Sequence, residues 1–152
     1  MAGGKGAVFA DEVLALILNG DGIPNLAENA SSSPLTNLYA SLHIASPGAT
    51  GSQNTNEAGY GGYARVALPR MSGGAFVVAG GVANPVASII WPTATNSGST
   101  AGSGSETEQF WAIGTAASGA GKILYWGPIT PNILVTQGVP PQLTTLTAIT
   151  ES

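Results

Sequence analysis

The sequence predicts an all-β fold, either an antiparallel β-sandwich or a jelly-roll-like barrel, with a short N-terminal helix. Three observations lead to this class. About eight short segments are rich in β-forming residues, several with period-two alternation. The 22 Gly and 10 Pro residues punctuate them with turns. Strands and helices do not alternate repeatedly, which argues against a parallel α/β sheet. We expect an N-terminal arm and helix over residues 1–33 and a β-sandwich domain over residues 34–152.

The expected helix covers residues 9–18, after an arm over residues 1–6 that is either flexible or ordered by a partner. Phe9, Val13, Leu16 and Ile17 share one face at the i, i+4, i+7 and i+8 positions. The sequence Asn-Gly-Asp-Gly at residues 19–22 ends the helix with residues that tolerate left-handed backbone. The alternative is that this segment inserts against another subunit, and its length fits both interpretations.

The strands begin after Pro34. Leu38, Ala40, Leu42 and Ile44 alternate with Tyr39, Ser41 and His43, so residues 38–45 predict a half-buried strand. A polar, Gly-rich loop follows at residues 50–62, and Gly73-Gly74 and Gly80-Gly81 predict turns. Residues 93–105 have the composition of a flexible linker. The other expected strands are residues 63–68, 75–79, 86–90, 109–114, 122–126, 133–135 and 143–150.

Charge is unusually scarce in this chain. Only 8% of the residues are charged, against about 25% in an ordinary soluble domain. We therefore expect neighbouring copies or partners to cover much of the surface; the alternative is a soluble coat of Ser, Thr, Asn and Gly. A net charge of −4 with four Lys and Arg residues predicts no nucleic-acid partner. No apolar run approaches the ~18 residues of a membrane span, so no membrane contact is expected.

Candidate chemistry is sparse, and we expect no enzyme, no cofactor and no resident metal. The sequence has no cysteine and one histidine, His43, which we interpret as a half-exposed or interface residue because no G-x-S-x-G motif accompanies it. Glu106 and Glu108 lie on one side of an extended segment. This spacing predicts a solvated edge or a weak calcium contact more than an acid/base pair.

Aromatic residues and one arginine are the remaining candidates. Trp111 and Trp126 lie inside strand patterns and predict core or subunit contacts. Tyr60 and Tyr63 flank a Gly-Gly pair at the end of the loop, where we expect them to be exposed. We expect Arg65 either to pair with a carboxylate or a carbonyl across an interface, or to be a surface charge that contributes little to stability.

Residues 38–69, which read LYASLHIASPGATGSQNTNEAGYGGYARVALP, resemble small tailed-bacteriophage virion proteins with the pattern SLHTADPG…TGANE…YAR. Residues 122–150 are similar to the family's ending, and residues 86–91 with the FWAIG segment to its middle. The chain departs from the pattern at Ile44-Ala45-Ser46, where the family has threonine-alanine-aspartate, and in a longer Asn-rich loop. Such proteins are head decoration or cement proteins, or associate with tail fibres.

The resemblance implies a structural virion protein, made in the host cytoplasm. Our main expectation is a capsid cement or decoration protein that bridges and stabilises major capsid subunits, with the major capsid protein and other copies of itself as partners in a homo-oligomer. The alternative is a tail or tail-fibre-associated component that contacts a host surface glycan. The expected interface residues are Phe9, Val13, Leu16, Ile17, Tyr60, Tyr63, Arg65, Leu146 and Ile149.

Overall fold

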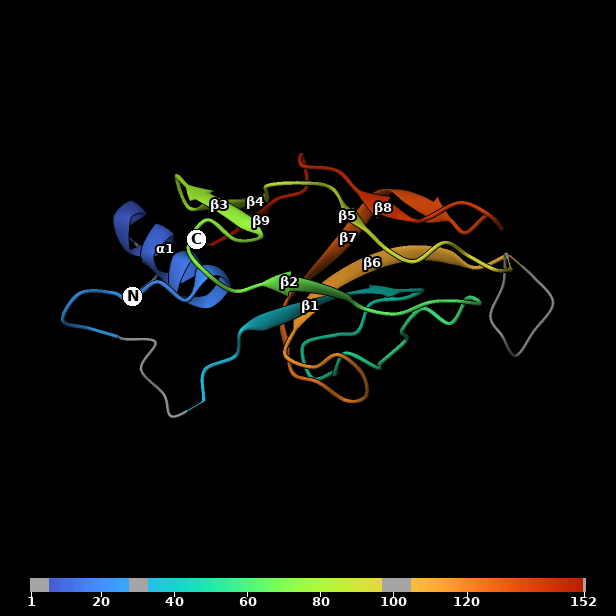
Figure 1. Cartoon of the computed structure of the whole chain (residues 1–152), viewed down its shortest axis with the longest axis horizontal. Helices are drawn as coiled ribbons and strands as arrows, with labels where there is room; N and C mark the ends of the chain where they lie inside the picture. Colours follow the sequence, from blue (N-terminus) through green and yellow to red (C-terminus); the bar gives the residue numbers. More distant parts are fainter. Residues whose placement is uncertain (1–5, 28–32, 97–104, 152) are drawn as a thin grey trace. The chain divides into compact units, whose positions relative to one another are not determined.

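The computed structural model describes residues 6–27, 33–96 and 105–151, and it divides the chain into two compact units (Figure 1). Unit 1 comprises Met1–Asn37, Leu68–Ser88 and Leu143–Ser152. Unit 2 comprises Leu38–Ala67 and Ile89–Gln142. The chain thus passes between the units several times, and each unit is built from segments that are distant in sequence.

Within the described residues, nine strands form three sheets. The larger sheet has the order β2-β1-β6-β7, a second has β3-β4-β9, and a third pairs β5 with β8. The β1–β6, β6–β7, β3–β4 and β4–β9 pairs are antiparallel. The prediction of an all-β, antiparallel fold with a short N-terminal helix is confirmed. The strands are β1 Asn37–His43, β2 Val66–Pro69, β3 Phe76–Ala79, β4 Val82–Pro85, β5 Ile89–Ile90, β6 Thr107–Gly114, β7 Ile123–Leu134, β8 Gln142–Leu143 and β9 Ile149–Thr150.

The helix of unit 1 starts as α1 (Ala7–Leu14) and continues as one π-helical turn, η1 (Ala15–Asn19). It ends at Gly20, whose φ of 74° confirms the predicted left-handed stop. The buried apolar side chains are Ala10, Leu14 and Leu18, so the predicted apolar face was offset by one residue. The segment carries apolar residues on two adjacent stripes, and periodicity alone does not choose between them. No helix within the described residues is long and apolar enough to cross a membrane.

The β3–β4 hairpin is the sheet element beside this helix in unit 1. Its two-residue turn, Gly80-Gly81, has φ values of 64° and 74°, the positive values that a type I′ hairpin turn requires. The Asp11 carboxylate on α1 accepts hydrogen bonds from both glycine amides. The predicted strand at residues 86–90 is displaced: β4 ends at Pro85, and only Ile89 and Ile90 form β5.

The core of unit 2 lies on the apolar face of the larger sheet. Leu38, Ala40 and Leu42 of β1 are buried, as the alternation predicts, and Ile113 of β6 is fully buried opposite Ala40. The Trp91 indole N–H donates to the Ala40 carbonyl oxygen at 3.3 Å. Strand β7 joins two predicted strands into one, running through Pro128 and Pro131, which an edge strand tolerates because one side needs no ladder bond.

The prediction of one C-terminal strand was wrong, and two other predictions fall largely outside the described residues. Residues 143–150 are not one strand, because β8 and β9 are separated by a turn in which the Thr147 amide donates to the Thr144 carbonyl oxygen. Within the linker-like stretch 93–105, residues 97–104 lie outside the described residues, as do residues 1–5 of the predicted arm.

Candidate interaction site

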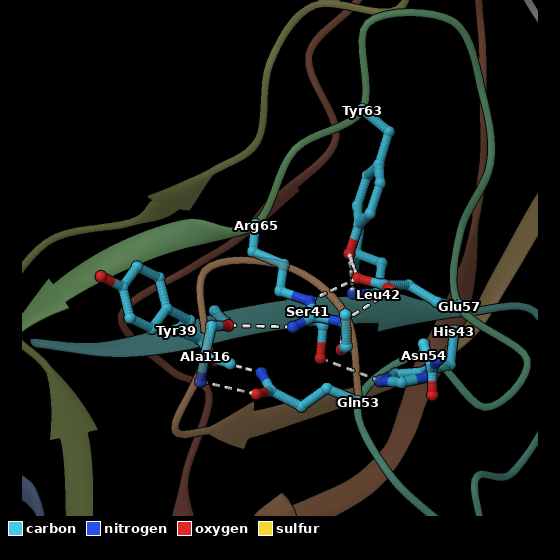
Figure 2. A network of polar contacts seen from close by, with 12 residues as sticks. Tyr39, Ser41, Leu42, His43, Gln53, Asn54, Glu57, Tyr63, Arg65 and Ala116 are labelled. Atoms are coloured by element: carbon cyan, nitrogen blue, oxygen red, sulfur yellow. Dashed lines mark hydrogen bonds and ion pairs between the residues drawn. The ribbon is translucent and has the colours of Figure 1, made fainter. Parts of the chain in front are cut away.

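A buried polar network in unit 2 fixes the loop that follows β1 (Figure 2). Gln53 is fully buried: its side-chain amide donates to the Tyr39 carbonyl oxygen at 3.1 Å, and its Oε1 accepts from the Ala116 amide at 3.0 Å. The backbone amide of Gln53 also donates, to the Gly121 carbonyl oxygen at 2.8 Å. One side chain therefore ties the loop to β1 and to the segment that joins β6 and β7.

His43 lies inside this network with no exposed surface. Its Nδ1–H donates to the Thr55 carbonyl oxygen at 2.9 Å, because a carbonyl only accepts, and its Nε2 lies 2.9 Å from the Ser41 hydroxyl. Burial lowers the pKa of His43, and these bonds suit the neutral ring. The expectation of a half-exposed histidine was wrong because the loop at residues 52–57 covers this face of β1. Ser41 and His43 form a hydroxyl–imidazole pair that no substrate reaches in this conformation.

Acid is expected to destabilise the fold through His43. The folded-state pKa lies below the usual 6.5, so its stabilising contribution is complete above pH 6.5 and is lost as pH falls below that value toward the folded-state pKa. The loss approaches about 1.4 kcal/mol per pH unit within that window. Urea unfolding at pH 7.5 and pH 5.0 measures it. The His43→Gln variant should show a flatter pH dependence between these values, and an unchanged slope would contradict the assignment.

Arg65, Glu57 and Tyr63 form the second part of the network (Figure 2). Arg65 pairs with both carboxylate oxygens of Glu57, from Nε at 2.6 Å and from Nη2 at 2.7 Å. It also donates to the carbonyl oxygens of Ala116 at 2.9 Å and Gly119 at 2.7 Å. The predicted partners, a carboxylate and backbone carbonyls, are therefore found within the chain itself. Arg65 closes the loop against the β6–β7 connection.

The two tyrosines at the end of the loop differ in environment from the expectation. Tyr60 is 2% exposed, and its hydroxyl donates to the Pro92 carbonyl oxygen at 3.0 Å, so the prediction of an exposed Tyr60 was wrong. The Tyr63 hydroxyl donates to Glu57 at 3.0 Å and accepts from the Leu42 amide at 3.1 Å. Burial raises the pKa of both phenols. Their rings meet edge to face at 5.3 Å, which packs the loop end.

Glu106 and Glu108 are buried, so the prediction that they lie on a solvated edge was also wrong. Glu106 Oε1 accepts hydrogen bonds from the amides of Gly59 at 2.8 Å and Tyr60 at 3.0 Å, which gives the loop its second anchor. Glu108 is fully buried. Burial is the largest cause that raises the pKa of Glu108 to about 9, and its side-chain interaction with Glu106 and then the charge of Glu106 raise it further. Glu108 is therefore a neutral acid at pH 7.

The exposed aromatic surface of unit 2 is on β7. Trp126 is 42% exposed, and its ring lies 5.9 Å from that of Phe110 on β6. Trp111 is buried, as expected for a core residue, whereas Trp126 is half open because β7 is an edge strand. The alternation of a strand predicts which residues share a face, but not which strand lies at the edge.

The predicted interface residues fall into both units. Tyr60, Tyr63 and Arg65 come together in unit 2, whereas Leu146, which is 87% exposed, and the buried Ile149 belong to unit 1. Phe9 is 40% exposed on α1. Val13, Leu16 and Ile17 are half-buried on the same helical segment. Inter-subunit contact by these residues stays a prediction.

Sequence reasoning missed the role of Arg70. Its guanidinium donates from Nε to the Ile17 carbonyl oxygen at 2.7 Å and from Nη2 to the Leu16 carbonyl oxygen at 2.6 Å. The last carbonyls of a helix lack intrahelical partners, and a cation there also suits the helix dipole. An arginine just after a predicted strand gave no signal of this distant contact.

The arrangement presents a loop that several hydrogen bonds anchor, together with part-exposed apolar side chains. Within the described residues, no group of three or more His, Cys, Asp and Glu side chains gathers as a metal site would need. A protein-family model, described as podophage GP4 fiber I protein gp80, matches residues 21–147. No curated protein matches the chain.

Proposed function

Because the chain belongs to the podophage GP4 fiber I protein gp80 family, we propose that it is a structural component associated with the tail fibre of the particle. The single observation that carries this proposal is the family match over residues 21–147. The resemblance of residues 38–69 to phage virion proteins agrees with it. The family description favours the fibre alternative over the capsid cement function that was the main expectation.

The chemistry of the chain supports an assembly role without catalysis. Several large apolar side chains are more than half exposed, among them Val8, Leu26, Met71, Leu134 and Leu146. Charged residues make up only 8% of the chain. Apolar surface that neighbouring subunits cover contributes to association without the desolvation cost of charges. The buried network holds the loop of unit 2 against β1 and the β6–β7 connection.

The location of the chain in the particle tests this proposal. A short affinity tag carrying a gold label, placed at the C-terminus, should appear at the tail or its fibres in electron micrographs of purified phage. Labels distributed over the capsid surface would contradict the fibre assignment and favour the cement function. Cell-wall and capsule zymograms should show no clearing by the purified chain, and a clear zone would contradict a purely structural role.

Contact with a host surface glycan is a second candidate, favoured by one observation, the half-exposed Trp126 packed on Phe110. Aromatic faces pack well against the apolar faces of sugar rings. The Trp126→Ala variant should lose at least ten-fold in affinity for host-surface polysaccharide, measured by biolayer interferometry. Leu134→Ala, a change at another exposed apolar residue of β7, is the matched control. Equal affinities of both variants and the parent would remove Trp126 from the glycan contact.

A further inference from the structure

Unit 1 contains a groove beside the free edge of its three-stranded sheet. The groove has a volume of about 740 Å³. Asn19 and Asp21, at the end of η1 and just after it, line one part, and Phe76, Val77 and Val78 of β3 line another. Strand β3 is the outermost strand in the order β3-β4-β9. The groove therefore borders a sheet edge that no strand of this chain occupies.

The backbone of β3 presents unpaired groups at this edge. Across the tight Gly80-Gly81 turn, Ala79 faces Val82, and the Val86 amide donates to the Ala75 carbonyl oxygen. In an antiparallel pair every second residue exchanges bonds with its partner strand, so Phe76 and Val78 turn their N–H and C=O groups away from β4. No hydrogen bond among the described residues satisfies these groups. Phe76 is only 2% exposed, so Val78 is the residue whose free donor and acceptor an added strand can reach.

A second, independent observation points to an occupant. Asn19 is 9% exposed, and its Oδ1 is buried without a hydrogen-bond partner while the residue lines the groove. Leaving such an acceptor unpaired is unfavourable, so the site gains from a ligand that donates a hydrogen bond. Asp21 is the one ionisable side chain among the described lining residues, so the groove has an acidic group and no basic one.

We propose that this groove binds an extended polypeptide segment of another subunit of the particle, which adds as a strand to the edge of β3. The segment pairs its backbone with the half-buried Val78, and a Lys or Arg side chain on it faces Asp21. A second copy of this chain fits less well, because it offers only four Lys and Arg residues, and Arg65 and Arg70 already hold partners within the chain. The inference rests on the proposed place of the chain in the particle.

A sugar is the weaker occupant for this groove. The aromatic ring in its lining, Phe76, belongs to a residue that is only 2% exposed, so it offers little face for a sugar ring to cover. The unpaired groups repeat with the two-residue spacing of a strand, which a peptide backbone matches and a sugar does not. Backbone pairing, rather than an apolar contact alone, is thus the property to measure.

Hydrogen exchange followed by mass spectrometry compares the purified chain with the same chain in intact phage. The peptide covering residues 75–80 should exchange at least ten-fold more slowly in the particle than in the free chain. Equal rates, in a particle shown to contain the chain, would overturn the inference and leave the proposed function standing. Absence of the chain from the particle would instead overturn the proposed function. Two other results would also overturn the inference. One is protection of residues 75–80 in the free chain that rises with the concentration of the chain, and the other is protection that host polysaccharide alone produces.

A charge reversal sharpens the test. Asp21→Lys should repel the basic segment and reduce the protection of residues 75–80 in the particle by at least ten-fold. Glu12→Lys, on α1 and outside the groove, is the matched control and should leave the protection unchanged. Thermal unfolding of both free variants shows that they fold. Equal protection in the two variants would contradict the role of Asp21 and the chemistry assigned to the segment.

Discussion

Replacing Glu108 with glutamine is expected to stabilise the protein strongly at neutral and alkaline pH. In the folded chain burial raises the pKa of Glu108 from the usual 4.5 to about 9, so the acid stays protonated, whereas the unfolded chain ionises above pH 4.5. The unfolded state therefore binds fewer protons, and stability falls as pH rises from 4.5 to 9. The penalty at pH 7 reaches about 3 kcal/mol. Glutamine is neutral in both states and removes it.

The pH dependence separates this effect from a simple packing gain. The Glu108→Gln advantage in urea unfolding should be nearly absent at pH 4.5 and should grow until about pH 9. Glu12→Gln, on α1 in unit 1, is the control for loss of a carboxylate that does not neighbour Glu108. That variant should not gain stability. An advantage of Glu108→Gln that is equal at both pH values would contradict the buried neutral acid.

Breaking the Arg65–Glu57 pair is expected to destabilise unit 2 by about 3 to 5 kcal/mol. The Arg65 side chain is 2% exposed and that of Glu57 is 17% exposed. Arg65→Met leaves Glu57 poorly solvated and removes the donors of two backbone carbonyls. Chemical unfolding monitored by tryptophan fluorescence gives the free energy of unfolding.

A double-mutant cycle isolates the pair. Arg65→Met with Glu57→Gln should cost less than the sum of the single changes, since the second change removes the charge that the first leaves unpaired. Lys122→Met is the control for loss of an exposed positive charge and should alter the free energy of unfolding by at most about 0.5 kcal/mol. Additive single effects would show that Arg65 and Glu57 act independently.

The sequence predicted the fold class because the local patterns were unambiguous at several elements. Leu38, Ala40 and Leu42 alternate cleanly, and they are buried in β1. The positive-φ turn at Gly80-Gly81 followed from the two glycines, which adopt that conformation without strain. The helix was predicted, but its buried face was not. The residues that are buried, Ala10, Leu14 and Leu18, are apolar, and so are the residues of the face that was predicted to be buried.

The candidate site was less predictable because it depends on contacts between distant segments. His43 and Glu108 are buried by elements whose position no local pattern reveals. The carbonyl partners of Arg65 lie 51 and 54 residues away along the chain. A strand pattern assigns a residue to one face, but the covering of that face by a loop is a tertiary property. The polar residues on one face of β1 therefore predicted exposure to solvent. In the structure they lie in a buried network instead.

The copy number of the chain in purified phage tests the central claim most directly. Quantitative mass spectrometry with isotope-labelled peptides gives its ratio to the major capsid protein and to a tail protein. A fibre-associated structural component should be present at a small multiple of the symmetry of the tail. A ratio near one to the major capsid protein would contradict the fibre assignment, and absence from the particle would contradict a virion role altogether.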